Sequence, residues 1–398
     1  PNSITATRKL LTPYDTAGCS GGSGRSVQIK GKICLPFQCI DTLRLMTIKC
    51  RRVWGGSYVS VNCSMADLVR YSLDNGHFEG HVVTSAWGQL FYRSIPRFAL
   101  APNKSWTRFL VTDDYRHAEA SYKGAVSFYL GMIGARLVFD KFLKGTKSNC
   151  QLLHAGDGTH FNLQASGGKR KPDYVAIDGR GVPYALVEAK GTSGARVAYE
   201  RVRYAKDQLK LASVITLTAT GHLCARQGAE LKKHVVTSSF RRDVASKGSS
   251  WELCDVDPEG AGEGQLTIQL DGAIYAHYLP MMQRLSRDGV RRESVNDVDC
   301  DLIQIGEGVS VGLVSGLREV IADRGNVGVG FGDQDSDVRE GDGDGCFRRV
   351  SEFFHSMERF EGLIEGEKVS MGGDGVVVVL SDDFEWCKLN RIDLGGRS

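Results

Sequence analysis

One short segment constrains the fold of this chain more than any other. Between Lys171 and Gly191, two apolar stretches, 174–177 and 184–187, flank a glycine-containing turn at 178–181. Short apolar runs on either side of such a turn predict a β-hairpin. If the turn is centred between residues 180 and 181, cross-strand partners have numbers that sum to 361, and Asp173 lies directly opposite Glu188.

This register places two carboxylates side by side. Directly opposed side chains have Cβ atoms about 4.5–5.5 Å apart, and two carboxylates at that separation repel unless one is protonated or a cation lies between them. A shared Mg²⁺ (or Mn²⁺), with bonds of about 2.0–2.1 Å for magnesium, is the natural counter-charge. Lys190 lies two residues after Glu188, so strand alternation predicts that it points to the same face, where it can orient or deprotonate a water molecule.

Two helices are predicted to flank the hairpin. The first spans about 116–143 and has apolar residues at spacings of three and four, which predict one buried face: Tyr122, Val126, Tyr129, Ile133 and Leu137. Glu119 lies three residues before Tyr122, so we expect it to extend that face at the helix start. Its carboxylate would then either compensate the helix dipole or point toward the sheet.

The second helix, predicted for about 196–211, has a basic face that carries one aromatic residue: Arg196, Tyr199, Arg203, Lys206 and Lys210. Its opposite side, formed by Val202, Ala205 and Leu209, is apolar and predicted to be buried. A second basic cluster precedes the hairpin and consists of Lys169, Arg170 and Lys171. Basic side chains next to a metal site are suited to binding phosphate groups of a nucleic acid, and an ordinary solvated helix face is the alternative.

Polar side chains just before the hairpin are candidates for an accessory role. His154, Asp157 and His160 could assist metal binding or transfer a proton to the leaving group. The alternative is that the histidines lie at strand ends and bond to neighbouring backbone groups.

The order Pro172-Asp173, then Glu188-Ala189-Lys190, resembles the PD-(D/E)xK nuclease superfamily over about residues 116–240. The resemblance implies an α/β fold with a restriction-endonuclease-like core, a mixed sheet flanked by helices. It also implies that Glu119, Asp173 and Glu188 bind the metal and that Lys190 assists the attacking water. Gln208 resembles a glutamine that some exonuclease-like branches place near the site, although the tyrosine expected four residues later is Ala212 here. The alternative is a solvated hairpin with charges at both ends.

Charge is distributed unevenly along the 398 residues, although the total is only +3. Residues 297–398 contain 22 acidic and 10 basic residues, a net charge of −12, and the preceding 296 residues have a net charge of +15. We therefore predict three parts: a β-rich N-terminal region at 1–115, the nuclease core at 116–290 and a small acidic α/β C-terminal module at 291–398. The acidic module is expected to dock a partner or to shield the basic face.

The sequence narrows the function classes as well. No apolar run approaches the roughly 18–20 residues that span a bilayer, and eleven singly scattered cysteines suggest a reducing compartment, so a cytoplasmic location without membrane partners is expected. The prediction is a magnesium-dependent nuclease that hydrolyses DNA phosphodiester bonds. By analogy, we expect it to act in bacterial restriction or anti-phage defence, with an ATPase, helicase or sensor protein as partner and with oligomerisation left open. Two alternatives stay open: an RNA-cleaving nuclease, and a non-cleaving nucleic-acid-binding or regulatory subunit of a defence or repair complex.

Overall fold

The chain divides into two units, 1–42 and 43–398. All residues that the computed structural model describes lie in the second unit. They are residues 45–51, 57–74, 94–144, 150–155, 160–164, 171–210, 212–219, 222–227, 231–243, 248–256, 264–286, 289–306, 308–322, 345–357, 364–365, 368–382 and 384.

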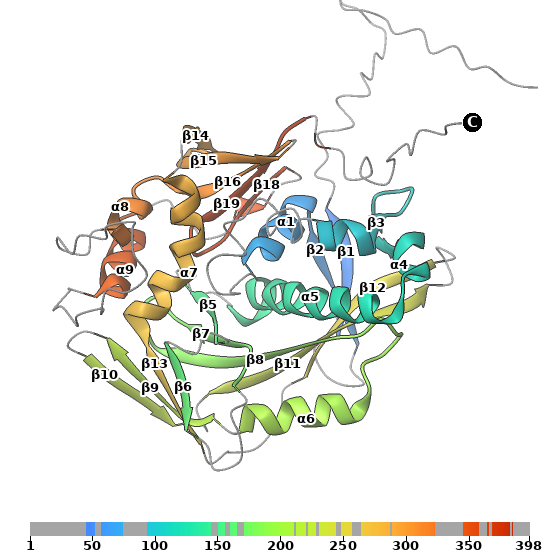
Figure 1. The fold of residues 1–398 in the computed structure, drawn as a ribbon, viewed down its shortest axis with the longest axis horizontal. Helices are drawn as coiled ribbons and strands as arrows, with labels where there is room; N and C mark the ends of the chain where they lie inside the picture. Colours follow the sequence, from blue (N-terminus) through green and yellow to red (C-terminus); the bar gives the residue numbers. More distant parts are fainter. Residues whose placement is uncertain are drawn as a thin grey trace, which may run out of the picture. The chain divides into compact units, whose positions relative to one another are not determined.

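A nine-stranded mixed sheet forms the centre of this unit (Figure 1). Its main path runs in the order β2 (Tyr58–Cys63), β1 (Met46–Arg51), β12 (Gly248–Val256), β11 (Lys232–Asp243), β8 (Pro183–Gly191), β7 (Tyr174–Ile177) and β5 (Gln151–His154). The short strands β3 (Leu100–Pro102) and β4 (Phe109–Val111) join it at β12. Strand β7 is antiparallel to both of its neighbours, β5 and β8, whereas β11 runs parallel to β8. The predicted α/β class is therefore confirmed.

The hairpin register predicted from the sequence is confirmed. Tyr174 pairs with Val187, and the next two pairs along β7 and β8 also have numbers that sum to 361. At the turn, Ile177 pairs with Pro183, one residue out of this register. Gly181 has a φ of +75°, a conformation that residues with a Cβ rarely adopt, which explains the glycine at this position.

The first predicted helix differs from the expectation of one continuous segment over 116–143. The chain forms α4 (Asp113–His117), then α5 (Ala120–Val138), which continues as a π-helical turn, η1 (Phe139–Leu143). The two helices are separated because Ala118 and Glu119 have extended backbone, with ψ of 153° and 151°. Three residues of the predicted apolar face are buried, namely Val126, Ile133 and Leu137. Tyr122, near the start of α5, is 44% exposed.

Helix α5 packs closely on β8 through two glycines (Figure 1). A Cβ on Gly191 would lie 1.6 Å from the carbonyl oxygen of Ser127, and a Cβ on Gly131 would lie 2.8 Å from the backbone nitrogen of Gly191. Only residues without a Cβ permit this approach of helix and strand backbones. Helix α6 (Tyr199–Lys210) covers the opposite face of β8 with the buried side predicted from the sequence: Val202, Ala205 and Leu209.

A second sheet of four strands is built from segments that lie between strands of the first sheet or, for one strand, after its last strand in the chain. Its order is β10 (His222–Gln227), β9 (Ala212–Ala219), β13 (Gly264–Gln269) and β6 (Phe161–Gln164). Strand β6 lies between β5 and β7 in the sequence, β9 and β10 lie between α6 and β11, and β13 follows β12. Helix α7 (Leu270–Leu285) follows β13 directly.

The C-terminal part contains a six-stranded sheet in the order β14 (Arg291–Val295), β15 (Val298–Gly306), β16 (Val309–Val314), β19 (Val376–Leu380), β18 (Val369–Met371) and β17 (Ile364–Glu365). It is accompanied by α8 (Leu317–Ala322) and α9 (Cys346–Ser356). Helix α1 (Met65–Asp74) packs on β18 and β19, and the hydroxyl of Ser370 bonds to both Arg70 and Asp67 at 2.9 and 2.6 Å. These contacts join residues of the predicted first and third parts; the boundaries at 115 and 290 stay predictions.

Candidate active site

The carboxylates of Asp173 and Glu188 lie side by side where β7 begins and β8 approaches its end. The backbone N–H of Asp173 donates to Oε2 of Glu188 at 3.2 Å. In return, Oδ2 of Asp173 accepts from the backbone N–H of Ala189 at 2.7 Å. These reciprocal bonds lie just beyond the last paired residues of the hairpin, Tyr174 and Val187, and fix the orientation of both carboxylates.

Two further side chains complete the cluster. The ammonium of Lys190 forms an ion pair with Oε1 of Glu188, and the amide of Gln208 on α6 donates to Oε2 of Glu188 at 3.0 Å. Gln208 also donates to the carbonyl of Lys171, which anchors it at the start of the hairpin. The Glu188 side chain is 1% exposed and that of Lys190 18% exposed. The predicted orientation of Lys190 toward Glu188 is confirmed.

Burial sets the electrostatics of this cluster. Burial, followed by the nearby charge of Asp173, raises the pKa of Glu188 to about 8, although Lys190 opposes the change. Burial also raises the pKa of Asp173, against the lowering effects of Lys190 and the Ala189 N–H. Two like charges this close in a low-dielectric setting favour retention of one proton. The metal-free pair therefore carries a proton near neutral pH, and a cation that replaced that proton would be held by both carboxylates.

The donor set fits Mg²⁺ or Mn²⁺ with two protein carboxylates. Both carboxylates present hard oxygen donors on adjacent strands, and Mg²⁺ in phosphate-handling sites is commonly bound through one or two carboxylates, with water and substrate phosphate as the other ligands. Within the described ranges there is no group of three or more His, Cys, Asp or Glu side chains that could hold a metal ion. Among these described residues, no third carboxylate joins the cluster.

The structure does not bring Glu119 to the pair, contrary to the expectation that it extends a buried helix face. Its carboxylate is exposed and accepts a hydrogen bond from Ser121, because Glu119 is the extended residue that precedes α5. Glu119 also precedes Ser127, which contacts β8, by eight residues, about 12 Å along the helix axis. In addition, α5 covers the face toward which Gly191 points, whereas Glu188 and Lys190 alternate to the α6 face.

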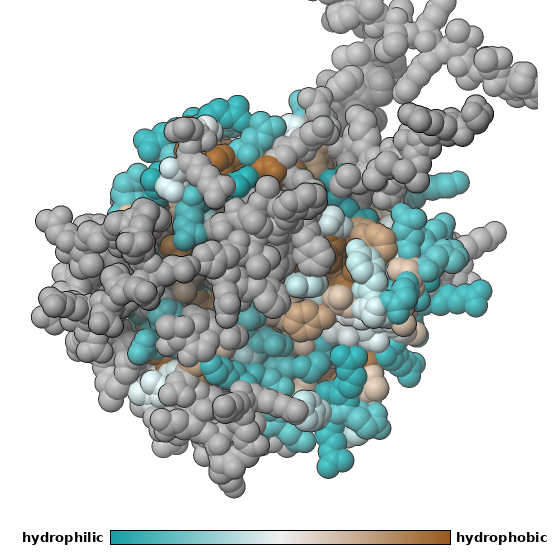
Figure 2. All heavy atoms as spheres, in the orientation of Figure 1, coloured by the Kyte–Doolittle hydropathy of each residue, from teal (hydrophilic) through white to brown (hydrophobic). Residues whose placement is uncertain are grey.

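The predicted basic helix face is present in part. Helix α6 begins at Tyr199 rather than at Arg196, because the preceding loop continues the sheet: Thr192 donates to the carbonyl of Ser238 at 3.0 Å. Tyr199 is 64% exposed, and Arg203 and the half-buried Lys206 follow it on the helix. Figure 2 shows a mostly hydrophilic surface over α6. The side chain of Lys210 lies outside the described residues.

The described residues before the hairpin make contacts away from the carboxylate pair. The ammonium of Lys171 donates to the carbonyl of Phe161 on β6. The ring of His154 contacts that of Tyr174, with centroids 5.3 Å apart, and Tyr174 alternates to the α5 face. His160 packs against Gly272 in the first turn of α7. Three predicted residues lie outside the described ranges: Asp157, Lys169 and Arg170.

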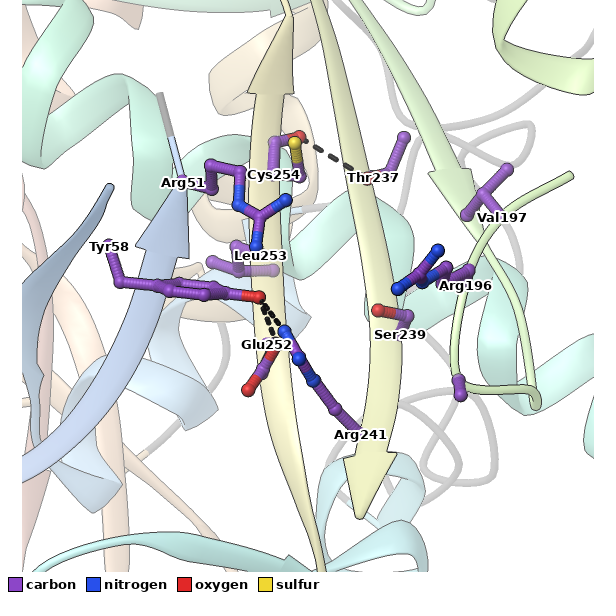
Figure 3. A pocket seen from close by; sticks show the side chains of 11 residues that line it. Arg51, Tyr58, Arg196, Val197, Thr237, Ser239, Arg241, Glu252, Leu253 and Cys254 are labelled. Carbon is purple, nitrogen blue, oxygen red and sulfur yellow. Dashed lines mark hydrogen bonds between the residues drawn. The ribbon is translucent and has the colours of Figure 1, made fainter. Parts of the chain in front are cut away.

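The same sheet face continues beyond Lys190 with residues that sequence analysis did not identify. Thr237 on β11 pairs with Lys190, and Cys254 on β12 pairs with Thr237. This face leads to a pocket between β1, β2, β11, β12 and the loop before α6, lined among others by Arg51, Tyr58 and Arg241 (Figure 3). Strand alternation predicts which side of its own strand each of these side chains occupies. The sequence around each strand does not indicate which strands from distant parts of the chain become its neighbours in the sheet.

Comparisons with known proteins give no relative: no protein-family model, curated protein or solved structure matches this chain. Among the helices of the described ranges, none is both long enough and apolar enough to cross a membrane.

Proposed function

We propose that the chain is a Mg²⁺- or Mn²⁺-dependent nuclease that hydrolyses phosphodiester bonds of DNA at the cluster formed by Asp173, Glu188 and Lys190. One observation carries the proposal: two carboxylates and an ammonium are gathered in the largely apolar hairpin of a central sheet. Burying two carboxylates in such a place costs free energy, whereas burying apolar residues there would not. A catalytic use of the pair accounts for their retention there.

The arrangement of the surrounding elements supports the proposal. The chain order is helix α5, strand β5, hairpin β7–β8, helix α6 and strand β11, with β11 parallel to β8. This is the order of elements that the resemblance to PD-(D/E)xK nucleases implies, and the restriction-endonuclease-like core is part of our proposal. The additional strands β6, β9 and β10 are inserted between these elements.

The side chains of the cluster have separate tasks in this reaction. When bound, Mg²⁺ would polarise a phosphoryl oxygen and make a water molecule more acidic. Asp173 and Glu188 hold the cation, and Gln208 fixes Glu188 through its 3.0 Å bond. The Nζ of Lys190 orients the attacking water and offsets the negative charge that develops on the phosphate in the transition state. The exposed basic side chains of α6 bind the nucleic-acid backbone near the cluster.

The test uses the purified full chain with labelled single- and double-stranded DNA and RNA, in Mg²⁺, in Mn²⁺ and in EDTA. We expect metal-dependent cleavage of DNA that Asp173→Asn and Lys190→Ala each reduce by at least about a hundredfold, since each removes a group that acts in the transition state. The variant Glu119→Ala distinguishes a site with two carboxylates, Asp173 and Glu188, from a site with three carboxylates that includes Glu119. Because Glu119 lies outside the pair, we expect this variant to retain cleavage.

Each alternative function has a distinct outcome in the same assay. Cleavage of RNA but not DNA would identify an RNA-cleaving nuclease. Binding of nucleic acid without cleavage in either metal would identify a non-cleaving subunit. Full metal-dependent cleavage by a folded Lys190→Ala protein would refute the proposed site. The setting in bacterial restriction or anti-phage defence, the ATPase, helicase or sensor partner and the cytoplasmic location stay predictions.

A further inference from the structure

A pocket on the same sheet face as the carboxylate pair is rich in arginine (Figure 3). It has a volume of about 140 Å³. Arg51 reaches it from β1, Arg241 from β11 and Arg196 from the loop that precedes α6. Small-molecule sites usually enclose about 300–1,000 Å³, so this pocket is suited to a small group rather than to a whole nucleotide.

The charges that line the pocket do not cancel. Three guanidinium groups face one carboxylate, that of Glu252, which gives a formal charge of +2. The hydroxyl of Tyr58 donates to Oε2 of Glu252 at 3.0 Å. Within the described part of the chain, no carboxylate forms an ion pair with Arg51, Arg196 or Arg241. The positive charge is therefore available to an anion.

Two of the three guanidinium groups are held in place before any ligand arrives. The Cζ of Arg51 lies 4.4 Å from the centroid of the Tyr58 ring, and that of Arg241 lies 5.8 Å from the same centroid. Arg241 also donates to the Tyr58 hydroxyl. The Nε of Arg51 is buried and has no hydrogen-bond partner among the described residues. A buried donor without an acceptor is costly, and an oxygen of a bound anion would accept from it.

The distance from the carboxylate pair suits a neighbouring phosphate of the same nucleic-acid strand. Thr237 lines the pocket and is the register partner of Lys190, so the pocket begins one strand away from the cluster. Arg51 is on β1, three strands from β8, and Arg241 is four residues past Thr237 on β11, so both lie about 14 Å from Lys190 along the sheet at about 4.8 Å per strand spacing and about 3.3 Å per residue. Nucleotides of a B-form strand rise about 3.4 Å each along the helix axis, and successive phosphates of the strand are farther apart than this rise, so a phosphate only a few nucleotides away reaches this distance.

We propose that this arginine pocket binds a backbone phosphate a few nucleotides from the bond that is cleaved. The interpretation of this distance as a spacing between phosphates rests on the proposed nuclease function. Its chemistry requires only a phosphate group: bidentate guanidinium–phosphate hydrogen bonds provide both affinity and orientation. Binding there positions the strand so that another phosphate lies at Asp173 and Glu188.

The test measures binding without cleavage, by fluorescence anisotropy of a labelled DNA oligonucleotide in EDTA over a range of salt concentrations. We expect Arg241→Ala and Arg196→Ala each to weaken binding about tenfold and to lower the slope of log affinity against log salt by about one. Arg196 lies in an exposed loop, so its replacement does not threaten the fold.

Arg242→Ala is the matched control. It removes the same charge from the next residue of β11, and it is exposed, but strand alternation directs it to the opposite face. We expect it to leave both affinity and salt slope close to those of the unmodified chain. Equal weakening by Arg242→Ala and Arg241→Ala would overturn the proposal, because it would show a general charge effect.

The two proposals fail separately. If the unmodified chain does not cleave but Arg241→Ala and Arg196→Ala weaken binding as expected, the nuclease function fails and the phosphate pocket stands. If the chain cleaves but both variants bind like the unmodified chain, the pocket proposal is overturned and the nuclease function stands. Absence of any nucleic-acid binding by the unmodified chain overturns both.

Discussion

Replacing Glu188 by glutamine should stabilise the metal-free protein at pH 8 while removing its proposed activity. The folded-state pKa of Glu188, about 8, lies above its ordinary value of 4.5 because of burial and the neighbouring Asp173. Between these two pH values the folded state binds more protons than the unfolded state. The contribution of Glu188 to the free energy of unfolding is therefore fully present below about pH 4.5 and is lost as the pH rises toward 8.

The size of this effect follows from the same two values. At about 1.4 kcal/mol per pKa unit, the interval from 4.5 to about 8 corresponds to at most about 5 kcal/mol of lost stability. That is a large share of the about 5–15 kcal/mol by which folded domains are usually stable. Glutamine has no charge to bury and can still accept from the Asp173 N–H, although Lys190 loses its partner.

The assay is urea unfolding in EDTA at pH 5, 6, 7 and 8, followed by tryptophan fluorescence, to which the buried Trp251 contributes. We expect the unmodified chain to lose stability across this range and Glu188→Gln to lose much less. Glu252→Gln, which replaces another buried carboxylate of the same sheet, should keep the unmodified dependence. An equal pH dependence in Glu188→Gln and the unmodified chain would refute the assignment of the proton to this pair. Mg²⁺ should stabilise the unmodified chain more at pH 8 than at pH 5.

Two packing predictions concern the scaffold around the site, and thermal unfolding measures both. Gly131→Ala should lower stability by about 1–3 kcal/mol, because the added Cβ would lie 2.8 Å from the backbone nitrogen of Gly191. Gly124→Ala, also in α5, should raise stability by up to about 1 kcal/mol, because its added Cβ would meet no atom within 4 Å. Equal effects of the two substitutions would contradict the close packing of α5 on β8. Ser370→Ala should lower the free energy of unfolding by about 1–3 kcal/mol, because it leaves buried polar groups of Arg70 and Asp67 with one partner fewer. A loss near zero would show that the contact between α1 and the C-terminal sheet adds no stability.

The hairpin could be predicted because its determinants are local. The apolar runs, the glycine turn and the period of two along each strand determine both that Asp173 lies beside Glu188 and the side to which Lys190 points. A hairpin register depends on residues within one turn and two strands, so it needs no knowledge of the remaining fold.

Two other elements of the candidate site could not be predicted in the same way. Glu119 and Arg196 both continue a helical spacing in the sequence, yet each lies just before its helix. The break before α5 lies in the extended backbone of Ala118 and Glu119, and the start of α6 is delayed because the loop pairs with β11. Periodicity gives the face of a helix but not its first residue. The arginine pocket depends on the order of β1, β11 and β12, which is a property of the assembled sheet.

The second sheet has a consequence for synthesis of the protein on the ribosome. Strand β6 pairs with β13, and the paired residues Gln164 and Gln265 are about 100 residues apart in the chain. At about 5–20 residues per second, β13 is made about 5–20 s after β6. During that interval β6 lacks this neighbour, and an unpaired strand edge can pair with other chains. We therefore expect the yield of native protein to depend on translation rate and on chaperones that bind nascent chains.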